Sequence, residues 1–575
     1  MEAFLAEWGE QGRKAHPNYH KKFTEVVARV DAHPNRRYFV LKSIILNNLY
    51  AVDIMEEAVE ICKLRLFLKL AAQVEPDSTK DNLGIEPLPD IDFNIRAGNT
   101  LVGYATAEEV RRCMKEDGGG QMKLMDEADL SAFDSFNIRC ADVEQAFTKF
   151  RQLQTEGDGS VPFSDKLELQ KRLKALEDEL NQHLAVEYGV KVSDKVAYAK
   201  WLKSHQPFHW FIEFYGIITS GGFDVILGNP PYVEYKDVKD SYKVYGFQTL
   251  ECGDLYAFTM ERAYRLLHRG GRVGLIVPVS IFCVDGFKSL QTLSLQKLES
   301  IWASSYANRP AQLFDGAQKR LTIVIGKRGE STTPTVHTTA YYRWRKEEFP
   351  NLFRARVCYA PMHTNFSVFQ ASLEKLGSTL EVSAFSKLAG RSERLETAVT
   401  SVAKHRVFYT RKFGYFLAFL DFVPRVTEIR TRKQVTPSEL KDLSFLNTAA
   451  VLTTIASLSS STFFWFWNVL SDCRNLNRRD ILSFPLNPIA LTEQERGRLA
   501  ALGEKYLKAL RAASSYIQKS GLMLHTFEYS STKPIIDEID TVLARHYGFT
   551  SEELDFILNY DIKYRLGRGA GEEEN

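Results

Sequence analysis

Four consecutive residues, Asn229 to Tyr232, combine hydrogen-bond acceptors, a stiff backbone and an aromatic ring. The side-chain oxygen of Asn229 and the carbonyl oxygen of Pro230 can together accept two hydrogen bonds from one planar amino group. The ring of Tyr232 offers a face on which a flat heterocycle can stack. Acceptors held in this way stabilise the positive charge that develops as an amino nitrogen attacks, so no strong general base is needed. The alternative is a proline-ended strand in which Asn229 only caps a turn.

The residues before Asn229 predict the element that positions this motif. Phe223 to Leu227 is a short apolar stretch, interrupted by Asp224 and flanked by glycines, which is typical of a buried strand. Pro230 keeps Asn229 out of the helical region, and two consecutive prolines stiffen the turn that follows. We therefore expect a rigid elbow at the carboxyl end of a parallel strand, where open α/β sheets bind their ligands.

The stretch FDVILGNPPY, from Phe223 to Tyr232, resembles the catalytic motif of the amino-group DNA methyltransferases, specifically those that methylate the exocyclic amine of adenine. The resemblance implies that Asn229, Pro230, Pro231 and Tyr232 are catalytic residues. It also implies S-adenosylmethionine as the methyl donor and an adenine flipped out of double-stranded DNA as the acceptor. The implied setting is restriction–modification or phage defence.

Two earlier stretches predict strands that would hold the methyl donor. NLYAVDI ends in Asp53 and Ile54, and FNIRAGNTL contains Asn99. An acidic residue that ends a strand in a nucleotide-binding unit typically binds ribose hydroxyls. The resemblance implies that Asp53 binds the ribose of the donor, that Asn99 contacts its adenine, and that Ile54 and Asn229 belong to the same site. The alternatives are a helix N-cap for Asp53 and a turn residue for Asn99.

The chain departs from this family before Asp53. Such enzymes begin with a strand and a glycine-rich turn around the methionine end of the donor, but Gly9, Gly12 and Gly118–Gly120 lie in polar sequence without a preceding strand. In the family this strand lies at the centre of the sheet, between the strands ending at Asp53 and Asn229. We therefore expect two unpaired strand edges, poor donor binding and marginal stability in this polypeptide.

The alternation of strands and helices predicts an α/β fold with a doubly wound, Rossmann-like methyltransferase sheet that lacks its first strand and glycine-rich turn. Further strands are expected at residues 272–278, 300–306 and 321–326. The resemblance implies that the last of them is reversed. The methyltransferase domain would span residues 1–330, with a helical insertion at 105–205. Residues 331–490 are expected to form an α+β target-recognition domain, and residues 491–575 a helical tail.

Residues 331–490 are strongly basic. They contain 21 Lys and Arg against 12 Asp and Glu, a charge of +9 in a chain whose total is +2. Such a region suits a polyanion, although surface charge also segregates by accident. CRNLNRR (Cys473–Arg479) resembles the end of the family's target-recognition domain. The candidates for DNA contact, with solvated surface as the alternative, are Arg474, Asn475, Asn477 and Arg478.

Composition argues against several classes of protein. No apolar run approaches the ~20 residues of a membrane helix. The seven cysteines lack the paired spacing of disulfides or structural zinc, so we expect a cytoplasmic protein without a metal. His205 and His209 are four apart, but Pro207 between them excludes a helical zinc pair.

Three functions remain open. The main one is adenine methylation of double-stranded DNA. The same elbow can methylate a protein glutamine or RNA, which the large basic region argues against. The third is a non-catalytic DNA-binding remnant or one half of a split methyltransferase, which the absent glycine-rich turn supports. Partners would then include a restriction or defence-system subunit, or a missing N-terminal fragment.

Overall fold

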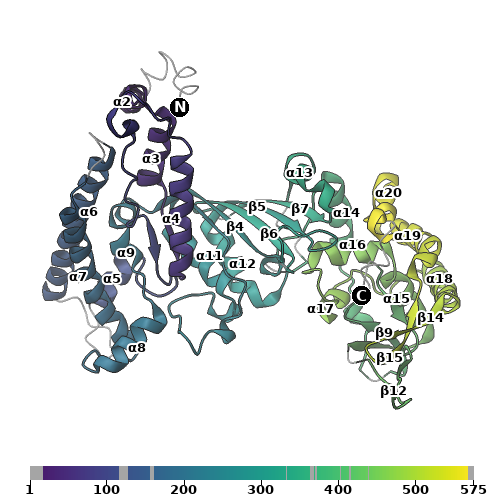
Figure 1. The fold of residues 1–575 in the computed structure, drawn as a ribbon. Coiled ribbons are helices and arrows are strands. Elements are labelled where there is room, and N and C mark those ends of the chain that lie inside the picture. Colours follow the sequence, from purple (N-terminus) through teal and green to yellow (C-terminus); the bar gives the residue numbers. More distant parts are fainter. Residues whose placement is uncertain are drawn as a thin grey trace. The chain divides into compact units, whose positions relative to one another are not determined.

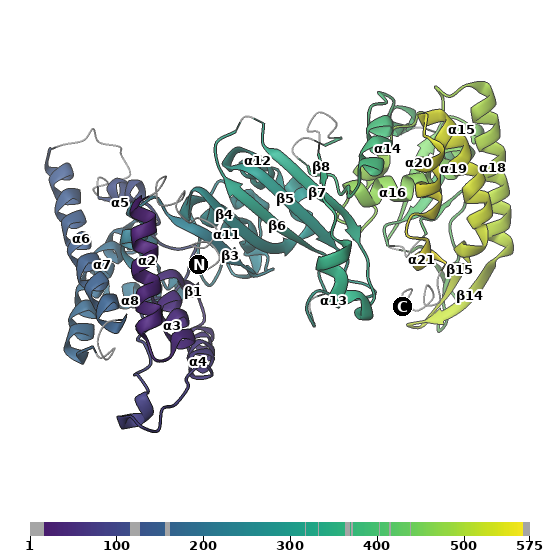
Figure 2. The same ribbon diagram turned by 90° about the horizontal axis from the view of Figure 1, so that it is seen from above.

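The computed structural model describes residues 17–114, 127–155 and 161–566. The positions left out within these ranges are residues 317, 332, 363–367, 370, 371, 402, 413–415 and 438. The chain divides into two compact units (Figures 1 and 2). Unit 1 holds residues up to Phe223 with 235–247 and 265–268, and unit 2 holds 224–234, 248–264 and the chain from Arg269. The glycines considered for the glycine-rich turn lie outside the described residues; they are Gly9, Gly12 and Gly118–Gly120.

Unit 1 begins with helices α2 (Pro17–Ala32) and α3 (Arg36–Asn48) and a pair of short strands. Strands β1 (Ala51–Asp53) and β2 (Ile95–Ala97) run parallel, with helix α4 (Glu56–Ala71) between them in the sequence. Apolar side chains from these elements form one core, made by Tyr38, Ile45, Leu46, Val59, Leu70, Ile91 and Ile95. Both predicted strands are present, but they are shorter than the apolar stretches that predicted them.

The rest of unit 1 is helical. Its helices are α5 (Ala107–Cys113), α6 (Glu127–Thr155), α7 (Phe163–Glu187), α8 (Lys195–His205), α9 (Trp210–Glu213) and α10 (Tyr215–Thr219). The two long helices α6 and α7 lie side by side in both ribbon views (Figures 1 and 2). The repeated leucines of α7 are buried with Phe133, Phe136 and Phe147 of α6, so they serve local packing.

Unit 2 is built on a six-stranded mixed sheet with the order β3-β4-β6-β5-β7-β8. The strands are β3 (Phe223–Gly228), β4 (Leu267–Pro278), β5 (Leu298–Tyr306), β6 (Leu321–Arg328), β7 (Thr335–Tyr342) and β8 (Ala360–Pro361). β6 runs antiparallel to β4 and β5, whereas β7 runs parallel to β5. Helices α11 (Leu255–Leu266) and α12 (Lys288–Lys297) belong to this part of the fold. Because β7 and β8 join the sheet, it extends past the expected domain boundary at residue 330.

The strands that the sequence predicted to form one continuous sheet lie in two separate sheets. β1 and β2 form a sheet of their own, and β3 is the terminal strand of the larger sheet. Among the described residues no strand pairs with the outer edge of β3, where Val225 and Leu227 are 56% and 78% exposed. An apolar side chain on a free strand edge is unusual in a finished sheet. Among the described residues, β1 pairs with β2 alone and β3 with β4 alone.

A second core follows the large sheet. Its helices include α14 (Thr379–Ala389), α15 (Thr448–Leu458), α16 (Ser461–Leu470) and α17 (Arg478–Leu482). Strands β10 (Phe419–Leu420), β9 (His405–Thr410) and β13 (Leu440–Phe445) form a small antiparallel sheet beside them. Helix α13 (Phe349–Asn351) precedes this core in the chain. The aromatic run Phe463–Trp467 on α16 is fully buried and is core. Over the described ranges no single helix is long and apolar enough to span a membrane, and α15 with α16 passes that test only as a bent pair.

Residues 491–575 do not form a purely helical tail, which corrects the sequence-based expectation. The described part of this region contains helices α18 (Glu493–Ala512), α19 (Lys533–Tyr547), α20 (Ser551–Asn559) and α21 (Ile562–Arg565). Between them lies a hairpin of β14 (Ser514–Lys519) and β15 (Leu522–Phe527). Ser520 and Gly521 both have positive φ, 50° and 78°, as a two-residue hairpin turn requires. β15 also pairs with β11 (Val426–Glu428), which pairs with β12 (Gln434–Val435).

Candidate functional site

The elbow lies where the sequence predicts it, immediately after β3. Asn229 is exposed, whereas Pro230 is buried and anchors the turn. The Tyr232 hydroxyl lies 2.6 Å from the side-chain oxygen of Asn229 and 3.0 Å from the carbonyl oxygen of Ile276 in β4. A hydroxyl has one proton, so the two acceptors share it. Asn229 is therefore tied to the sheet through Tyr232, while its side-chain oxygen keeps a second lone pair for another donor.

Tyr232 is half-buried beside an aromatic row. Its ring meets the ring of Tyr256 edge-on, with 6.3 Å between centroids and an angle of 84°. Tyr256 in turn stacks on Phe287 at 5.5 Å. Burial raises the pKa of Tyr232 to about 12, so its phenol stays protonated and remains a donor at neutral pH. Sequence reasoning missed Tyr256, because an aromatic residue on an amphipathic helix carries no signal beyond packing.

Asp53 and Ile54 lie at the carboxyl end of β1, and both are exposed. One carboxylate oxygen of Asp53 accepts a hydrogen bond from the backbone N–H of Met55 at 2.8 Å. Helix α4 begins at Glu56 with Met55 at its N-cap position, so the alternative of an N-cap role for Asp53 is wrong. No described residue is in hydrogen-bond contact with the other carboxylate oxygen of Asp53, which leaves it available to a ligand.

Asn99 follows β2 at the same end of the two-stranded sheet. It is 3% exposed, and its side-chain oxygen accepts a hydrogen bond from the backbone N–H of Leu101 at 3.1 Å. Its backbone N–H donates to the carbonyl oxygen of Gln206 at 2.8 Å. The side-chain nitrogen Nδ2 is buried and has no hydrogen-bond partner in the described part of the chain. A buried donor of this kind costs about 1–3 kcal/mol unless a ligand or water accepts from it.

The predicted site residues thus fall into separate groups. Asp53, Ile54 and Asn99 come together in unit 1, and Asn229 to Tyr232 in unit 2. Asn229, which was also a donor-site candidate, belongs to the second group.

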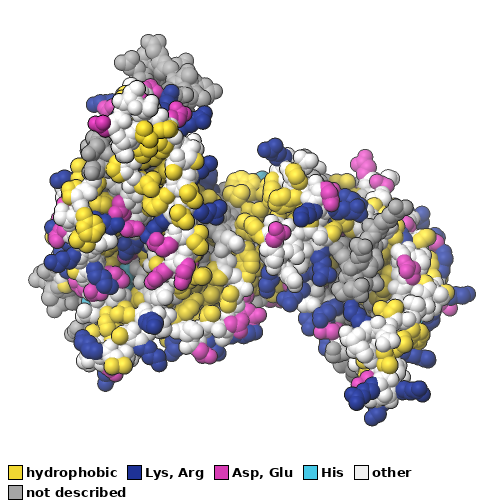
Figure 3. All heavy atoms as spheres, viewed as in Figure 1, with side chains coloured by type: hydrophobic (Ala, Val, Ile, Leu, Met, Phe, Trp, Pro, Cys, Tyr) yellow, Lys and Arg dark blue, Asp and Glu magenta, His cyan; other side chains and the backbone are white. Residues whose placement is uncertain are grey.

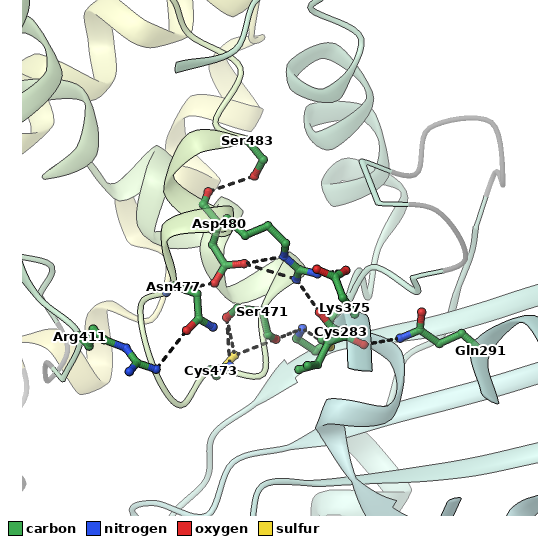
Figure 4. A network of polar contacts seen from close by, with 12 residues as sticks. Cys283, Gln291, Lys375, Arg411, Ser471, Cys473, Asn477, Asp480 and Ser483 are labelled. Carbon is green, nitrogen blue, oxygen red and sulfur yellow. Dashed lines mark hydrogen bonds and ion pairs between the residues drawn. The ribbon is translucent and has the colours of Figure 1, made fainter. Parts of the chain in front are cut away.

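The four predicted DNA contacts lie in the loop between α16 and α17 and at the start of α17. Figure 4 labels one of them, Asn477. Arg474 and Arg478 are exposed, and Asn475 and Asn477 are partly buried. The guanidinium of Arg478 donates to the carbonyl oxygen of Asp442 at 3.3 Å. Two of the four are therefore open to solvent, as a DNA contact requires.

Asn477 has a structural role in the same loop. It occupies the N-cap position of α17, and its backbone N–H donates to the Asp480 carboxylate at 3.4 Å. Its side-chain oxygen accepts from Arg411 at 3.4 Å. Asn477 is therefore the least available of the four candidates.

A polar cavity of about 260 Å³ lies beside this loop. It is lined by Cys283, Val284, Asp285, Ser471, Asp472, Asn477, Arg479 and Asp480. Arg479 donates to the carbonyl oxygen of Cys283 at 2.6 Å, forms an ion pair with Asp285 and lies 3.9 Å from the ring centroid of Phe369. Burial raises the pKa of Asp480 to about 6.

A buried cation, Lys375, lies beside the same loop (Figure 4). The Lys375 ammonium donates to the carbonyl oxygens of Val469 at 2.9 Å and Ser471 at 2.6 Å, and it lies 3.4 Å from the Cys283 sulfur. Sequence reasoning missed both Lys375 and Arg479, because only their contacts in the folded chain distinguish them from the many other cations of this basic region. Together they fix the predicted DNA-contact loop to the segment that follows β4.

The two histidines noted in the sequence have separate structural contacts. The ring of His209 is buried and accepts from the backbone N–H of Tyr104 at 3.2 Å. The ring of His205 instead accepts from the backbone N–H of Lys243 at 3.1 Å. Over the ranges that the structure describes, no group of three or more His, Cys, Asp or Glu side chains could hold a metal ion.

Comparison with known proteins points to one kind of enzyme. Residues 47–308 match the family model "Eco57I restriction-modification methylase". A protein of Methanocaldococcus jannaschii named "Putative type II restriction enzyme and methyltransferase" is 28% identical over 314 residues. That match covers 49% of this chain and 26% of the relative, so the chain spans about a quarter of its curated relative's length.

Solved structures give a weaker likeness. The Type IIL restriction–modification enzyme MmeI in complex with DNA has 12% identity and a TM-score of 0.33, covering 80% of this chain and 76% of that chain. The ATP-dependent Type ISP restriction–modification enzyme LlaBIII bound to DNA has 11% identity and a TM-score of 0.33, covering 83% and 35%. Similarity at these TM-scores supports no conclusion about this chain. The family match over residues 47–308 is what supports a restriction–modification methylase.

Proposed function

We propose that this chain is a site-specific DNA methyltransferase that transfers a methyl group from S-adenosylmethionine to the exocyclic amino group of adenine, in restriction–modification or phage defence. The observation that carries the proposal is the elbow after β3. There Asn229 is exposed, Pro230 is buried, and the Tyr232 hydroxyl lies 2.6 Å from the Asn229 side-chain oxygen. The family match over residues 47–308 supports the broader class.

The elbow suits an amine that is a poor nucleophile. The lone pair of an adenine amino group is delocalised into the ring, so the nitrogen must become pyramidal before it can attack. The side-chain oxygen of Asn229 and the carbonyl oxygen of Pro230 would accept its two N–H groups and stabilise the charge that develops. Tyr232, held through its hydroxyl to Ile276, would stack on the base. Pro231 keeps the turn stiff, so the acceptors are positioned before the base arrives.

The donor site is proposed at the carboxyl end of the β1–β2 sheet. When bound, S-adenosylmethionine supplies a methyl group on a sulfonium sulfur. The buried Nδ2 of Asn99 suits an acceptor nitrogen of the donor's adenine, which would remove the cost of leaving that N–H group unpaired. The free carboxylate oxygen of Asp53 suits a ribose hydroxyl, and exposed Ile54 lies beside it. The Nδ2 group of Asn99 and the carboxylate of Asp53 thus suit the adenine and the ribose of S-adenosylmethionine.

Double-stranded DNA is the proposed partner of the basic region. Exposed Arg474 and Arg478 suit phosphate contacts, which fix the position of the duplex without reading its sequence. Asn475 suits a base edge. Asn477 would have to give up its contact with Arg411 before it could contact DNA.

A second candidate function is one half of a split methyltransferase. The specific observation in its favour is the free edge of β3, on which Val225 and Leu227 are exposed. A further strand paired with that edge would bury both side chains and satisfy the unpaired backbone groups. In that case the chain would need a second polypeptide segment for donor binding.

Two measurements test these proposals. The first is incubation of the chain, with any segment that wild-type activity requires present, with labelled S-adenosylmethionine, double-stranded DNA and RNA, followed by mass spectrometry of the nucleosides and of the digested protein. We expect N6-methyladenine, whereas label on cytosine, RNA or protein glutamine would refute the adenine assignment. The second is calorimetric titration of the donor into residues 1–575. Tight binding by this chain alone would refute the split-enzyme candidate and our prediction of poor donor binding.

A further inference from the structure

Two turns far apart in the sequence are joined at one end of the sheet β12-β11-β15-β14. The first turn, residues 429–433, connects β11 to β12, and the second, residues 519–521, connects β14 to β15. The backbone N–H of Ile429 donates to the carbonyl oxygen of Gly521 at 3.0 Å, so the two turns support each other. We call these two segments the basic double turn. It combines the basic region with part of the predicted tail.

The basic double turn is rich in cations that have no counterion. Arg430, Arg432, Lys433 and Lys519 are all exposed, and none forms an ion pair within the described part of the chain. The acidic residue of the β11–β12 hairpin is Glu428, whose carboxylate accepts a hydrogen bond from the Thr431 hydroxyl at 2.6 Å. Figure 3 shows Lys and Arg side chains gathered at the end of the molecule where Figure 1 labels β12. Cations held close together without acids repel one another, and a polyanion relieves that repulsion.

One face of the same sheet carries groups that suit nucleic acid. Tyr516 in β14 pairs with His525 in β15. The backbone N–H of His525 donates to the carbonyl oxygen of Arg425, the residue before β11, so these three side chains share a face. Tyr516 is 53% exposed and stacks on His525 with 4.7 Å between ring centroids. Gln518 and Gln434 lie on the same face, two pairing positions further along. Polar and aromatic side chains beside a cluster of cations form the usual composition of a DNA-contacting surface.

We infer that the basic double turn contacts the phosphate backbone of double-stranded DNA. This inference rests on the proposed function and extends it, because the surface differs from the loop at 474–478 and includes residues of the predicted tail. Two-stranded β-ribbons are narrow enough to lie along a groove, with their turns against the backbone. Arg430, Arg432, Lys433 and Lys519 would each replace condensed counterions at a phosphate.

The test is the salt dependence of DNA binding. Binding of a labelled double-stranded DNA fragment to the full chain is measured over a potassium chloride series, for the wild type and for the triple variant Arg430→Gln, Arg432→Gln and Lys433→Gln. Each phosphate contact contributes about 0.9 to the slope of log K against log salt. We expect the slope of the triple variant to be shallower by about 2 to 3. Lys519→Gln alone, on the other turn, should remove about 0.9.

A matched control removes the same charge elsewhere. Lys195, Lys200 and Lys203 on α8 are also exposed and form no ion pair in the described chain, so changing all three to Gln should leave the slope unchanged. A wild-type slope in both the triple variant and Lys519→Gln would overturn the inference and leave the proposed function standing. An equal loss of slope in the α8 control would also overturn it, because the effect would then be one of net charge. A wild-type chain that binds no DNA would overturn the proposed DNA substrate itself.

Discussion

The hydroxyl of Tyr232 provides a sharp test of how the elbow works. Tyr232→Phe keeps the ring but removes the donor that lies 2.6 Å from the Asn229 side-chain oxygen and 3.0 Å from the Ile276 carbonyl oxygen. One such hydrogen bond is worth about 0.5–1.5 kcal/mol, which is the expected cost of freeing the Asn229 carboxamide. Methyl transfer in a single turnover should therefore slow by roughly 2- to 13-fold. Tyr232→Ala should be slower still, because base stacking worth about 1–3 kcal/mol is lost as well.

The assay separates positioning from stacking. Single-turnover methyl transfer reports the chemical step, and 2-aminopurine at the target position reports whether the base leaves the stack. Tyr232→Phe should slow transfer with an unchanged fluorescence signal, whereas Tyr232→Ala should change both. The matched control is Tyr264→Phe, which removes a hydroxyl 3.0 Å from Ser294 in the core. A wild-type rate in Tyr232→Phe would refute the positioning role, and equal rates in Tyr232→Phe and Tyr232→Ala would refute stacking.

Two further predictions concern stability. Burial raises the pKa of Asp480 to about 6, so the folded state binds its proton more tightly than the unfolded state, and the free energy of unfolding should fall by up to about 3 kcal/mol as pH rises from about 4 to 7. Asp480→Asn should remove that part of the pH dependence in urea titrations, and an unchanged profile would contradict the assignment. Asp561→Ala should cost about 3 kcal/mol, because it leaves the Arg343 guanidinium buried without its ion-pair partner. Glu538→Ala, in the exposed pair with Lys505, should cost less than ~1 kcal/mol, and equal costs would contradict the reasoning.

The elbow and its strand could be predicted because their signals are local. An apolar run bounded by glycines defines β3, and Pro230 and Pro231 end it whatever surrounds them. The strands at Leu298 and Leu321 were likewise visible as apolar runs.

Features that depend on distant partners could not be predicted. β7 pairs with β5 across more than thirty residues, and nothing local separates it from the basic region that follows. The β14–β15 hairpin joins β11 from nearly a hundred residues away, which makes it part of another sheet and not of a helical tail. Lys375 and Arg479 become distinct from other cations only through their contacts with distant segments. Likewise, only the three-dimensional contacts reveal that the buried Nδ2 of Asn99 has no hydrogen-bond partner among the described residues.

The central claim is that Asn229 acts on the amino group of the target base and does not hold the fold or the DNA. Its side chain is exposed beyond the end of β3, so Asn229→Ala should leave the core intact. The most direct test compares methyl transfer and double-stranded DNA affinity in this variant, with any segment that wild-type activity requires present. We predict that methyl transfer falls by at least ~10²-fold, the usual cost of one transition-state hydrogen bond, while the DNA Kd changes by less than ~2-fold. Retained methyl transfer, or loss of transfer and DNA binding together, would contradict the account.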